Sequence, residues 1–224
     1  MDDGATAKPL TAFLVIFFTV FSVDAEAQTV DPQSLRSFLA SDLHKGLMAK
    51  AEAATPPEVF HRCPSFVPSG SKVMIAKPMT FDQNGVPSAG AWWERIPVAG
   101  CGNDTIVNLY FAVGPDGKIT TIVAFPGTTR ADILLQRDAL KFAYFGAGSR
   151  VRDCKTFVVT NTRFENFGLR NPVTPDPGAD AGYRPWWETW TVLGCGKSFD
   201  VPMNFIPDAT GTTINQPLRD IVAH

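Results

Sequence analysis

Hydrophobic and polar residues alternate over several short stretches, and this period of two is typical of β-strands with one buried face. The pattern predicts strands over residues 73–81, around 92–98, 107–113 and 119–125, and again over 155–164, 186–192, 201–205 and 212–216. An Asn84-Gly85 pair and the segment Gly-Pro-Asp-Gly at 114–117 favour tight turns between them. The stretch 171–182 is longer and rich in proline, which predicts a loop.

Two other stretches have the period of a helix. The first begins at Asp31-Pro32, places Leu35, Phe38, Leu39, Leu43 and Leu47 on one face, and ends before Thr55-Pro56-Pro57. The second begins near Thr129 and carries an apolar face until Gly146 and Gly148 end it; that face is formed by Leu135, Ala139, Phe142 and Ala143. Each helix is followed by a group of strands, so the pattern predicts two similar units.

An internal repeat gives the same organisation independently. The segment 92–117 aligns without a gap on 186–211, a shift of 94 positions that matches Trp-Trp-Glu with Trp-Trp-Glu and Gly-Cys-Gly with Gly-Cys-Gly. Upstream, Cys63 and Cys154 are each followed by phenylalanine three residues later. We therefore predict a tandem duplication of the α+β class, each unit being one helix packed on a three- to four-stranded antiparallel meander with one internal disulfide. The units span 28–128 and 129–224, and whether they share one sheet is open.

The N-terminal region predicts export. An uncharged apolar run at 12–23 is too short to span a bilayer comfortably, and Ala25-Glu26-Ala27 is a pattern that a signal peptidase cleaves. Residues 1–27 are therefore predicted to be a signal peptide, removed before Gln28, which places the protein in a periplasm or outside the cell. Because Lys8 alone supplies positive charge, against Asp2 and Asp3, an uncleaved anchor is the alternative.

Four cysteines in an exported chain favour two disulfides. The repeat selects Cys63 with Cys101 and Cys154 with Cys195, each closing a loop of about forty residues. A zinc site is the rival interpretation, but the cysteines do not come in close pairs and only three histidines could assist them, His44, His61 and His224. We predict no metal and no other cofactor.

Charge excludes one class of partner. Without residues 1–27 the chain has 19 basic and 18 acidic residues, since one lysine and four acidic residues are removed from the totals of 20 and 22. A net charge near +1, with no basic run that includes aromatic residues, does not favour nucleic acid. Partners are expected among small molecules, glycans and envelope proteins, with no membrane contact after signal cleavage.

The two tryptophan segments contain the candidate binding residues. Trp92, Trp186 and Trp190 share a strand face with valines and are expected in the core, because alternate residues point to opposite faces. Trp93 and Trp187 share the other face with polar residues, so each needs a cover: the other unit, a flat ligand such as a sugar ring, or a partner protein. Candidate ligand-binding residues are Trp93, Glu94, Arg95, Trp187 and Glu188.

Glu94 and Glu188 are the charged residues on the apolar face. We expect each to pair with an arginine or to accept backbone N–H groups, because a buried carboxylate needs such partners. The alternative is a pair of carboxylates that hydrolyse a glycoside.

Recognisable catalytic motifs are missing from the sequence. It contains no Gly-x-Ser-x-Gly, His-Glu-x-x-His, phosphate-binding glycine loop or dinucleotide fingerprint. His44 is placed on the exposed side of the first helix, and neither it nor His61 is expected to be a general base. The sequence thus favours a non-enzymatic exported binding or interaction protein. The alternatives are a secreted glycoside hydrolase that uses Glu94 and Glu188, and a structural envelope protein or enzyme inhibitor.

Overall fold

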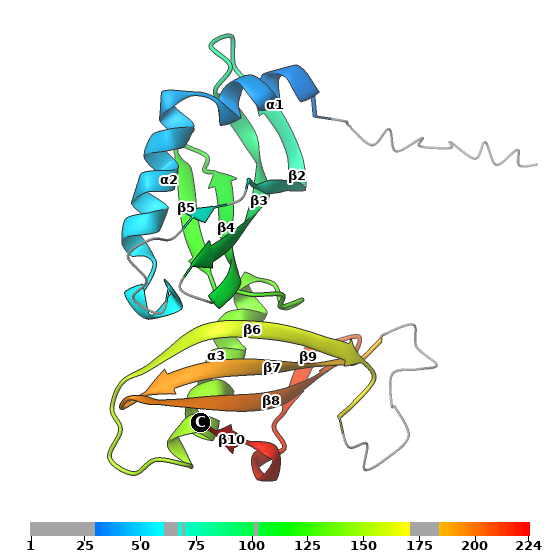
Figure 1. Cartoon of the computed structure of the whole chain (residues 1–224). Coiled ribbons are helices and arrows are strands. Elements are labelled where there is room, and N and C mark those ends of the chain that lie inside the picture. The colour runs from blue at the N-terminus through cyan, green and yellow to red at the C-terminus, as the bar shows by residue number, and fades with distance from the viewer. Residues whose placement is uncertain (1–29, 61–66, 69, 101–102, 171–183) are drawn as a thin grey trace, which may run out of the picture.

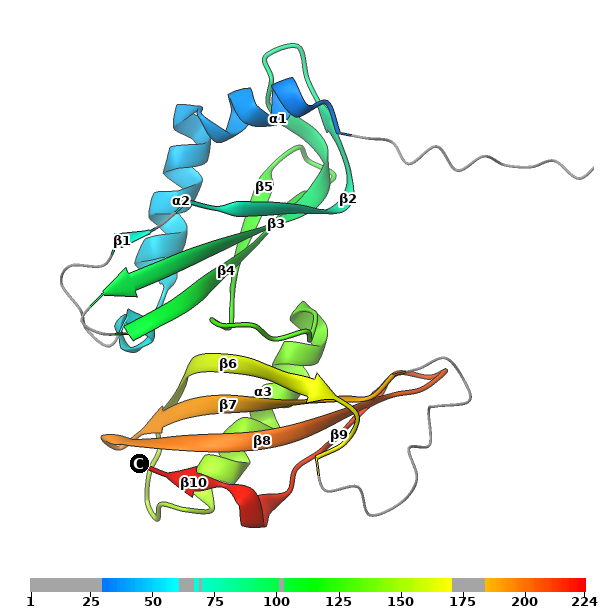
Figure 2. The ribbon, with the colours of Figure 1, turned by 45° about the vertical axis from the view of Figure 1, so that its right-hand side comes forward.

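The computed structural model describes residues 30–60, 67–68, 70–100, 103–170 and 184–224. These residues form two five-stranded antiparallel sheets, one from each half of the chain, and α-helices pack against one face of each sheet (Figures 1 and 2). The predicted α+β class is therefore confirmed, and the two halves build separate sheets. The predicted signal peptide, residues 1–27, lies outside the described residues.

Two helices open the first half, where the sequence pattern predicted one. α1 (Pro32–Leu39) begins after Asp31, whose carboxylate accepts a hydrogen bond from the backbone N–H of Ser34. α2 (Asp42–Ala54) begins after Ser41, whose hydroxyl accepts from the backbone N–H of His44. A serine that caps the free N–H groups of a helix start competes with helix continuation, so the chain turns there. The 3-10 helix η1 (Pro57–Phe60) follows α2.

The break changes which side of α2 faces the sheet. His44, Leu47 and Ala51 are buried, at helical spacings of three and four, whereas Leu43 is 44% exposed. The expectation that His44 lies on the exposed side of the helix is wrong. It assumed one continuous helix, and the new start at Ser41 rotates the buried face toward His44.

The first sheet consists of β1 (Val67–Pro68), β2 (Lys72–Phe81), β3 (Pro87–Gly100), β4 (Asn103–Val113) and β5 (Ile119–Ala124). β1 and β2 pair one after the other with the same edge of β3, and β4 and β5 continue the sheet on its other side. Phe38 of α1 meets Trp92 edge to face, with ring centroids 5.5 Å apart, and Trp92 stacks on Phe111. The helices and sheet thus share one aromatic core.

The second half places one long helix before its sheet. α3 (Ile133–Gly148) is followed by β6 (Phe157–Phe167), β7 (Trp186–Gly194), β8 (Lys197–Pro207), β9 (Thr212–Asn215), the 3-10 helix η3 (Leu218–Asp220) and β10 (Val222–Ala223). β9 and β10 both pair with the outer edge of β8, so the strand order is β6–β7–β8 and then these two.

Small residues let α3 lie close to its sheet. Ala139, Ala143 and Ala147 are fully buried, and a Cβ atom at Gly146 would lie only 2.9 Å from Val201. The buried side of α3 includes Gln136, whose side-chain oxygen accepts from the N–H of Phe125. Phe142, expected to point inward, is instead 37% exposed. A large ring would not fit where the alanines bring the helix against β8.

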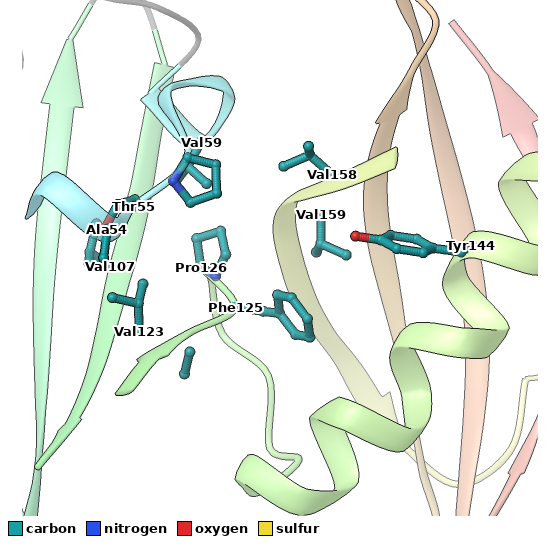
Figure 3. Close-up of a pocket in the computed structure, with 12 residues that line it drawn as sticks. Ala54, Thr55, Val59, Val107, Val123, Phe125, Pro126, Tyr144, Val158 and Val159 are labelled. Carbon is teal, nitrogen blue, oxygen red and sulfur yellow. The ribbon is translucent and has the colours of Figure 1, made fainter. Parts of the chain in front are cut away.

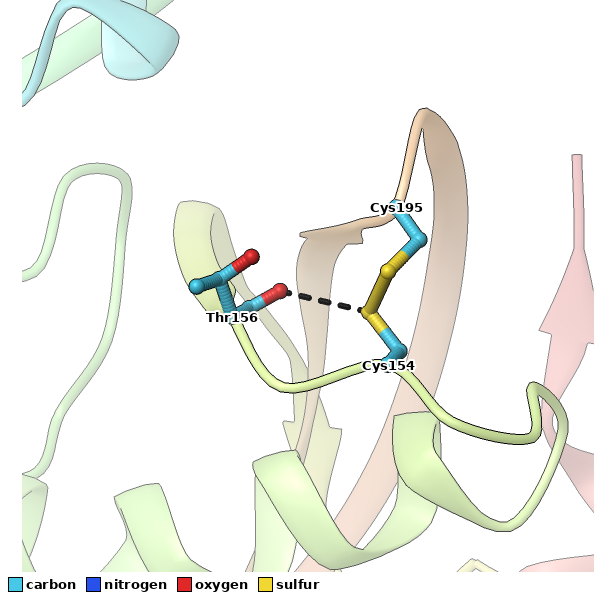
Figure 4. Close-up of a disulfide and its surroundings, with 3 residues drawn as sticks. All are labelled: Cys154, Thr156 and Cys195. Atoms are coloured by element: carbon cyan, nitrogen blue, oxygen red, sulfur yellow. Dashed lines mark hydrogen bonds between the residues drawn. A yellow bond between two sulfur atoms is a disulfide. The ribbon is translucent and has the colours of Figure 1, made fainter.

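The Gly-Cys-Gly segment of the second half makes a tight hairpin that holds a disulfide. Cys195 and Gly196 both have positive φ, 49° and 76°, and they join the paired residues Gly194 and Lys197. Two positive φ values are typical of the type I′ turn, whose twist suits a hairpin. Cys195 is bonded to Cys154 with a Cα–Cα distance of 5.8 Å (Figure 4). The predicted pairing of these two cysteines is confirmed.

The carbonyl oxygen of Thr156 lies 3.4 Å from the sulfur of Cys154, which has no hydrogen to donate because it is in the disulfide (Figure 4). The other predicted pair, Cys63 and Cys101, lies outside the described residues.

Candidate functional site

Glu94 is a hydrogen-bond acceptor inside the first core. Its side chain is 0% exposed, and Oε1 accepts from Nε1 of Trp92 at 3.0 Å and lies 2.8 Å from Nε2 of His44. Oε2 is buried and, among the described residues, has no hydrogen-bond partner. In the described part of the chain, Glu94 bonds to neither of the partner types expected from the sequence, arginine and backbone N–H; His44 of α2 takes that place and ties the helix to β3.

Glu188 has the same position in the second core and is more fully bonded. Oε1 accepts from Nε1 of Trp186 and from the backbone N–H of Arg130, and Oε2 accepts from Nε1 of Trp190, each at 2.8 Å. The side chain is 0% exposed. The backbone N–H expected for a buried carboxylate is therefore present here. Three donors around one carboxylate compensate for the water it has lost.

This geometry does not favour hydrolysis by the two glutamates. The carboxyl groups of a glycosidase stand on either side of the bond that they cleave and must reach it. Glu94 and Glu188 are enclosed in separate cores. Glu94 lies against α2, and Glu188 lies against the segment that leads into α3. Glu94 is a polar link between β3 and α2, and Glu188 is a polar link between β7 and the segment that leads into α3.

Trp187 is covered by its own unit. The guanidinium of Arg170 lies 5.0 Å from the centroid of the indole ring, within the range of a cation–π contact. Nε of Arg170 donates to Asp220 at 2.9 Å, which fixes the guanidinium over the ring. Neighbouring strands place Asn166 and Asn204 beside Trp187. The cover proposed from the sequence was the other unit, a ligand or a partner; Arg170 was not anticipated.

Trp93 lies in a different environment from Trp187. Strand register places Met74, Trp93, Tyr110 and Ile122 in one row across the first sheet, on the face opposite α1 and α2. The rings of Trp93 and Tyr110 are 5.0 Å apart, and Ile122 is 37% exposed. Arg95 follows on the same face, with a buried Nε that has no hydrogen-bond partner among the described residues. The row is apolar and partly open, so Trp93 and Arg95 remain candidate binding residues.

A cavity lies between the two units (Figure 3). Its volume is about 270 Å³. The first unit contributes the end of α2, η1 and the strands β4 and β5, and the second contributes α3 and β6, with the connecting segment between them. The lining consists of Ala54, Thr55, Pro56, Val59, Val107, Val123, Ala124, Phe125, Pro126, Tyr144, Val158 and Val159.

The side chains that line the cavity are apolar, except those of Thr55 and Tyr144. Figure 3 shows the Tyr144 hydroxyl directed toward the valines of β6. No described residue hydrogen-bonds to it, although its ring packs beside Phe157. The hydroxyl of Thr55 is already bonded to the carbonyl of Ala51. Burial raises the pKa of Tyr144 above its ordinary value, so the phenol stays neutral and able to donate at physiological pH.

Backbone hydrogen bonds fix the two walls of the cavity relative to each other. The N–H of Gly127 donates to Ile106 of the first sheet at 2.7 Å, and the N–H of Thr162 in β6 donates to Pro126 at 2.8 Å. Nδ2 of Asn108 adds bonds to the carbonyls of Phe125 and Gly127. The connecting segment is thus bonded to both sheets, and the space beside it is a formed site between packed elements.

None of the five residues proposed from the sequence lines this cavity. Trp93 and Arg95 lie on the outer face of the first sheet, Trp187 lies under Arg170, and the two glutamates are in the cores. The segment Thr-Pro-Pro-Glu-Val at 55–59 contains three apolar residues yet lies outside the helix and strand patterns, and it was the available signal for a buried contact. Its partner on β6 could not be inferred from any periodicity.

No protein-family model, curated protein or solved structure matches this chain. In the described part of the chain, no group of three or more His, Cys, Asp or Glu side chains could hold a metal ion. The helices that the structure describes are all too short or too polar to cross a membrane.

Proposed function

We propose that this protein is an exported, non-enzymatic binding protein that holds a small, uncharged and largely apolar molecule between its two units. The observation that carries the proposal is the cavity of about 270 Å³ lined by apolar side chains, with the unbonded hydroxyl of Tyr144 directed into it. Because no charged side chain is among the lining residues, a charged ligand would lose its hydration without compensation. One hydrogen-bond acceptor on the ligand would satisfy the phenol.

We also infer that the two units arose by tandem duplication. Trp92 pairs with Phe111 and Gly100 with Asn103, and the same register joins Trp186 to Phe205 and Gly194 to Lys197, 94 positions later. On the other edge, β1 and β2 together correspond to β6. The pairs Val67–Ala99 and Val73–Glu94 recur as Val158–Leu193 and Phe164–Glu188, with a shift of 91 positions in the first residue of each pair. Shared register on both edges supports a common origin.

Export is supported by chemistry in the described chain. The disulfide between Cys154 and Cys195 is the kind of bond that persists in an oxidising compartment. It encloses β6 and β7 and so holds the wall of the cavity that β6 forms.

A matched pair of probes tests the binding site. Acetophenone and isopropenylbenzene have nearly the same shape, but only the ketone accepts a hydrogen bond. We expect both to shift the methyl NMR signals of Val107 and Val159, with acetophenone about 2- to 10-fold tighter, the worth of one neutral hydrogen bond. Tyr144→Phe should bring the two affinities together by weakening only the ketone.

Two further variants test whether the probes bind in this cavity. Ala54 is exposed at the end of α2 and lines the cavity, and its neighbour Ala53 is exposed but does not. Ala54→Phe should therefore weaken both probes, whereas Ala53→Phe, with the same added ring on the same helix turn, should not. The proposal fails if neither probe shifts these methyl groups at millimolar concentration, or if both alanine variants behave alike.

A further inference from the structure

The outer side of α3 carries large apolar residues that nothing in the described chain covers. Leu134 is 63% exposed, Phe145 64% and Phe142 37%, whereas the opposite side of the helix is packed on β7 and β8. Figure 1 shows that α3 lies behind its sheet. Exposed apolar residues of this size on one helix side are typical of an interaction surface.

Four residues on this side have the spacing of a coiled-coil seam. Leu134, Asp138, Lys141 and Phe145 follow one another at intervals of four, three and four residues. At 3.6 residues per turn, these intervals keep all four side chains on one stripe of the helix. The side chains of Asp138 and Lys141 are 54% and 80% exposed, so the stripe is open along its length.

The stripe is complementary to itself when two copies run antiparallel. A two-fold axis midway between positions 139 and 140 brings Leu134 level with Phe145 of the partner subunit. The same axis sets Asp138 against the partner's Lys141 and Lys141 against the partner's Asp138. Arg137 and Phe142, both exposed, flank the stripe on its two opposite sides. Apolar residues therefore meet at both ends of the stripe, and two pairs of opposite charges meet at its centre.

The charges also select the orientation. In a parallel pair the two copies of Asp138 would face each other, as would the two copies of Lys141, and like charges at a seam are unfavourable. Within one chain these two residues are only loosely paired, with 4.0 Å between Nζ of Lys141 and Oδ1 of Asp138. They remain available to a second chain.

From this pattern we propose that the protein forms a symmetric homodimer through antiparallel contact of α3 with α3 of a second copy. The inference is independent of the cavity, since none of the six residues of the stripe and its flanks lines it. A single helix pair is smaller than a standard protein interface, so the dimer should be weak and its population should depend on concentration.

Sedimentation velocity between about 1 μM and about 1 mM tests the dimer in the purified protein. We expect the weight-average mass to rise from one chain toward two. Leu134→Gln should weaken association at least about 10-fold, while Leu43→Gln, a change of an equally apolar exposed residue on α2, should leave it unchanged. A protein that stays monomeric throughout, or a Leu43 variant that dissociates as readily, would overturn the proposal.

Charge reversal tests the orientation. Asp138→Lys alone should weaken the dimer, because the new lysine faces the partner's Lys141, and Lys141→Asp alone should weaken it for the same reason. The double variant restores opposite charges at both levels and should dimerise like the wild type. All these positions are exposed, so circular dichroism should show unchanged folding. If neither single reversal weakened the dimer, or if the double variant did not restore it, another surface would mediate dimerisation.

Discussion

Nε1 of Trp92 donates a hydrogen bond to the carboxylate of Glu94, two residues further along the same strand, and Trp186 bonds to Glu188 in the same way. In both cases the tryptophan also stacks on a phenylalanine of the next strand, with ring centroids 5.0 Å apart. The repeated Trp-Trp-Glu segment is thus a core motif in which the first tryptophan and the glutamate hold each other. One sequence difference between the copies changes the bonding of the glutamate: Trp190 gives Glu188 a further donor, where the first unit has Ile96.

This difference predicts unequal effects of the same substitution. Both hydrogen bonds of Glu94 go to one oxygen, which an amide can reproduce, whereas Glu188 uses both oxygens. Glu188→Gln therefore leaves at least one buried N–H facing an NH₂ group and should cost about 1–3 kcal/mol of unfolding free energy. Glu94→Gln should cost less. Urea unfolding of both variants measures the difference, and equal losses would contradict the asymmetry.

Cys63 and Cys101 should form the second disulfide. The prediction rests on the repeat, in which they correspond to the bonded pair Cys154 and Cys195. Peptide mapping under non-reducing conditions should recover a fragment that links 63 to 101. Two free thiols at these positions, or a bond from either one to the second unit, would refute it. In the double variant Cys63→Ala/Cys101→Ala, unfolding of the first unit should become easier by about 2–4 kcal/mol.

Sequence periodicity predicted the strands well because each sheet has one buried face. Residues 119–125 and 212–216 were expected as strands, and β5 and β9 occupy Ile119–Ala124 and Thr212–Asn215. The core placement of Trp92 and Trp190, both 0% exposed, followed from the same alternation. The alternation of neighbouring residues is enough to show where a strand lies and which of its residues face the core, so no knowledge of distant contacts was needed.

Features that depend on long-range packing were not predictable in this way. His44 becomes buried because Ser41 restarts the helix and Glu94, fifty residues later, accepts its hydrogen bond. Arg170 covers Trp187 because Asp220, from the end of the chain, orients it. The cavity exists because η1 and β6 meet across the junction of the units. Each case joins segments that share no pattern in the sequence.

The raised pKa of Tyr144 predicts a loss of stability at alkaline pH. Burial disfavours the phenolate in the folded state, so the unfolded chain releases this proton at lower pH than the folded chain. The contribution is fully present below the unfolded pKa of about 10 and is lost as the pH rises through the folded value. In Tyr144→Phe the free energy of unfolding should therefore fall less steeply between about pH 9 and about pH 11. If the unfolding free energies of the wild type and Tyr144→Phe fell in parallel over this pH range, the effect of Tyr144 would be excluded.

Truncation to alanine should lower the free energy of unfolding by different amounts at Trp190, Trp187 and Trp93. Trp190 is fully buried, packs on Phe125 with ring centroids 5.2 Å apart and donates to Glu188, so Trp190→Ala should cost about 3–5 kcal/mol. Trp187→Ala removes a ring that lies under the guanidinium of Arg170, outside the second core, and should cost clearly less. Trp93→Ala should also be mild, since the ring lies in a partly open row beside Tyr110. Thermal unfolding of the three variants gives the order. If Trp93→Ala proved as destabilising as Trp190→Ala, the outer row would be part of the first unit's core, and Trp93 and Arg95 would no longer be candidates for binding a partner.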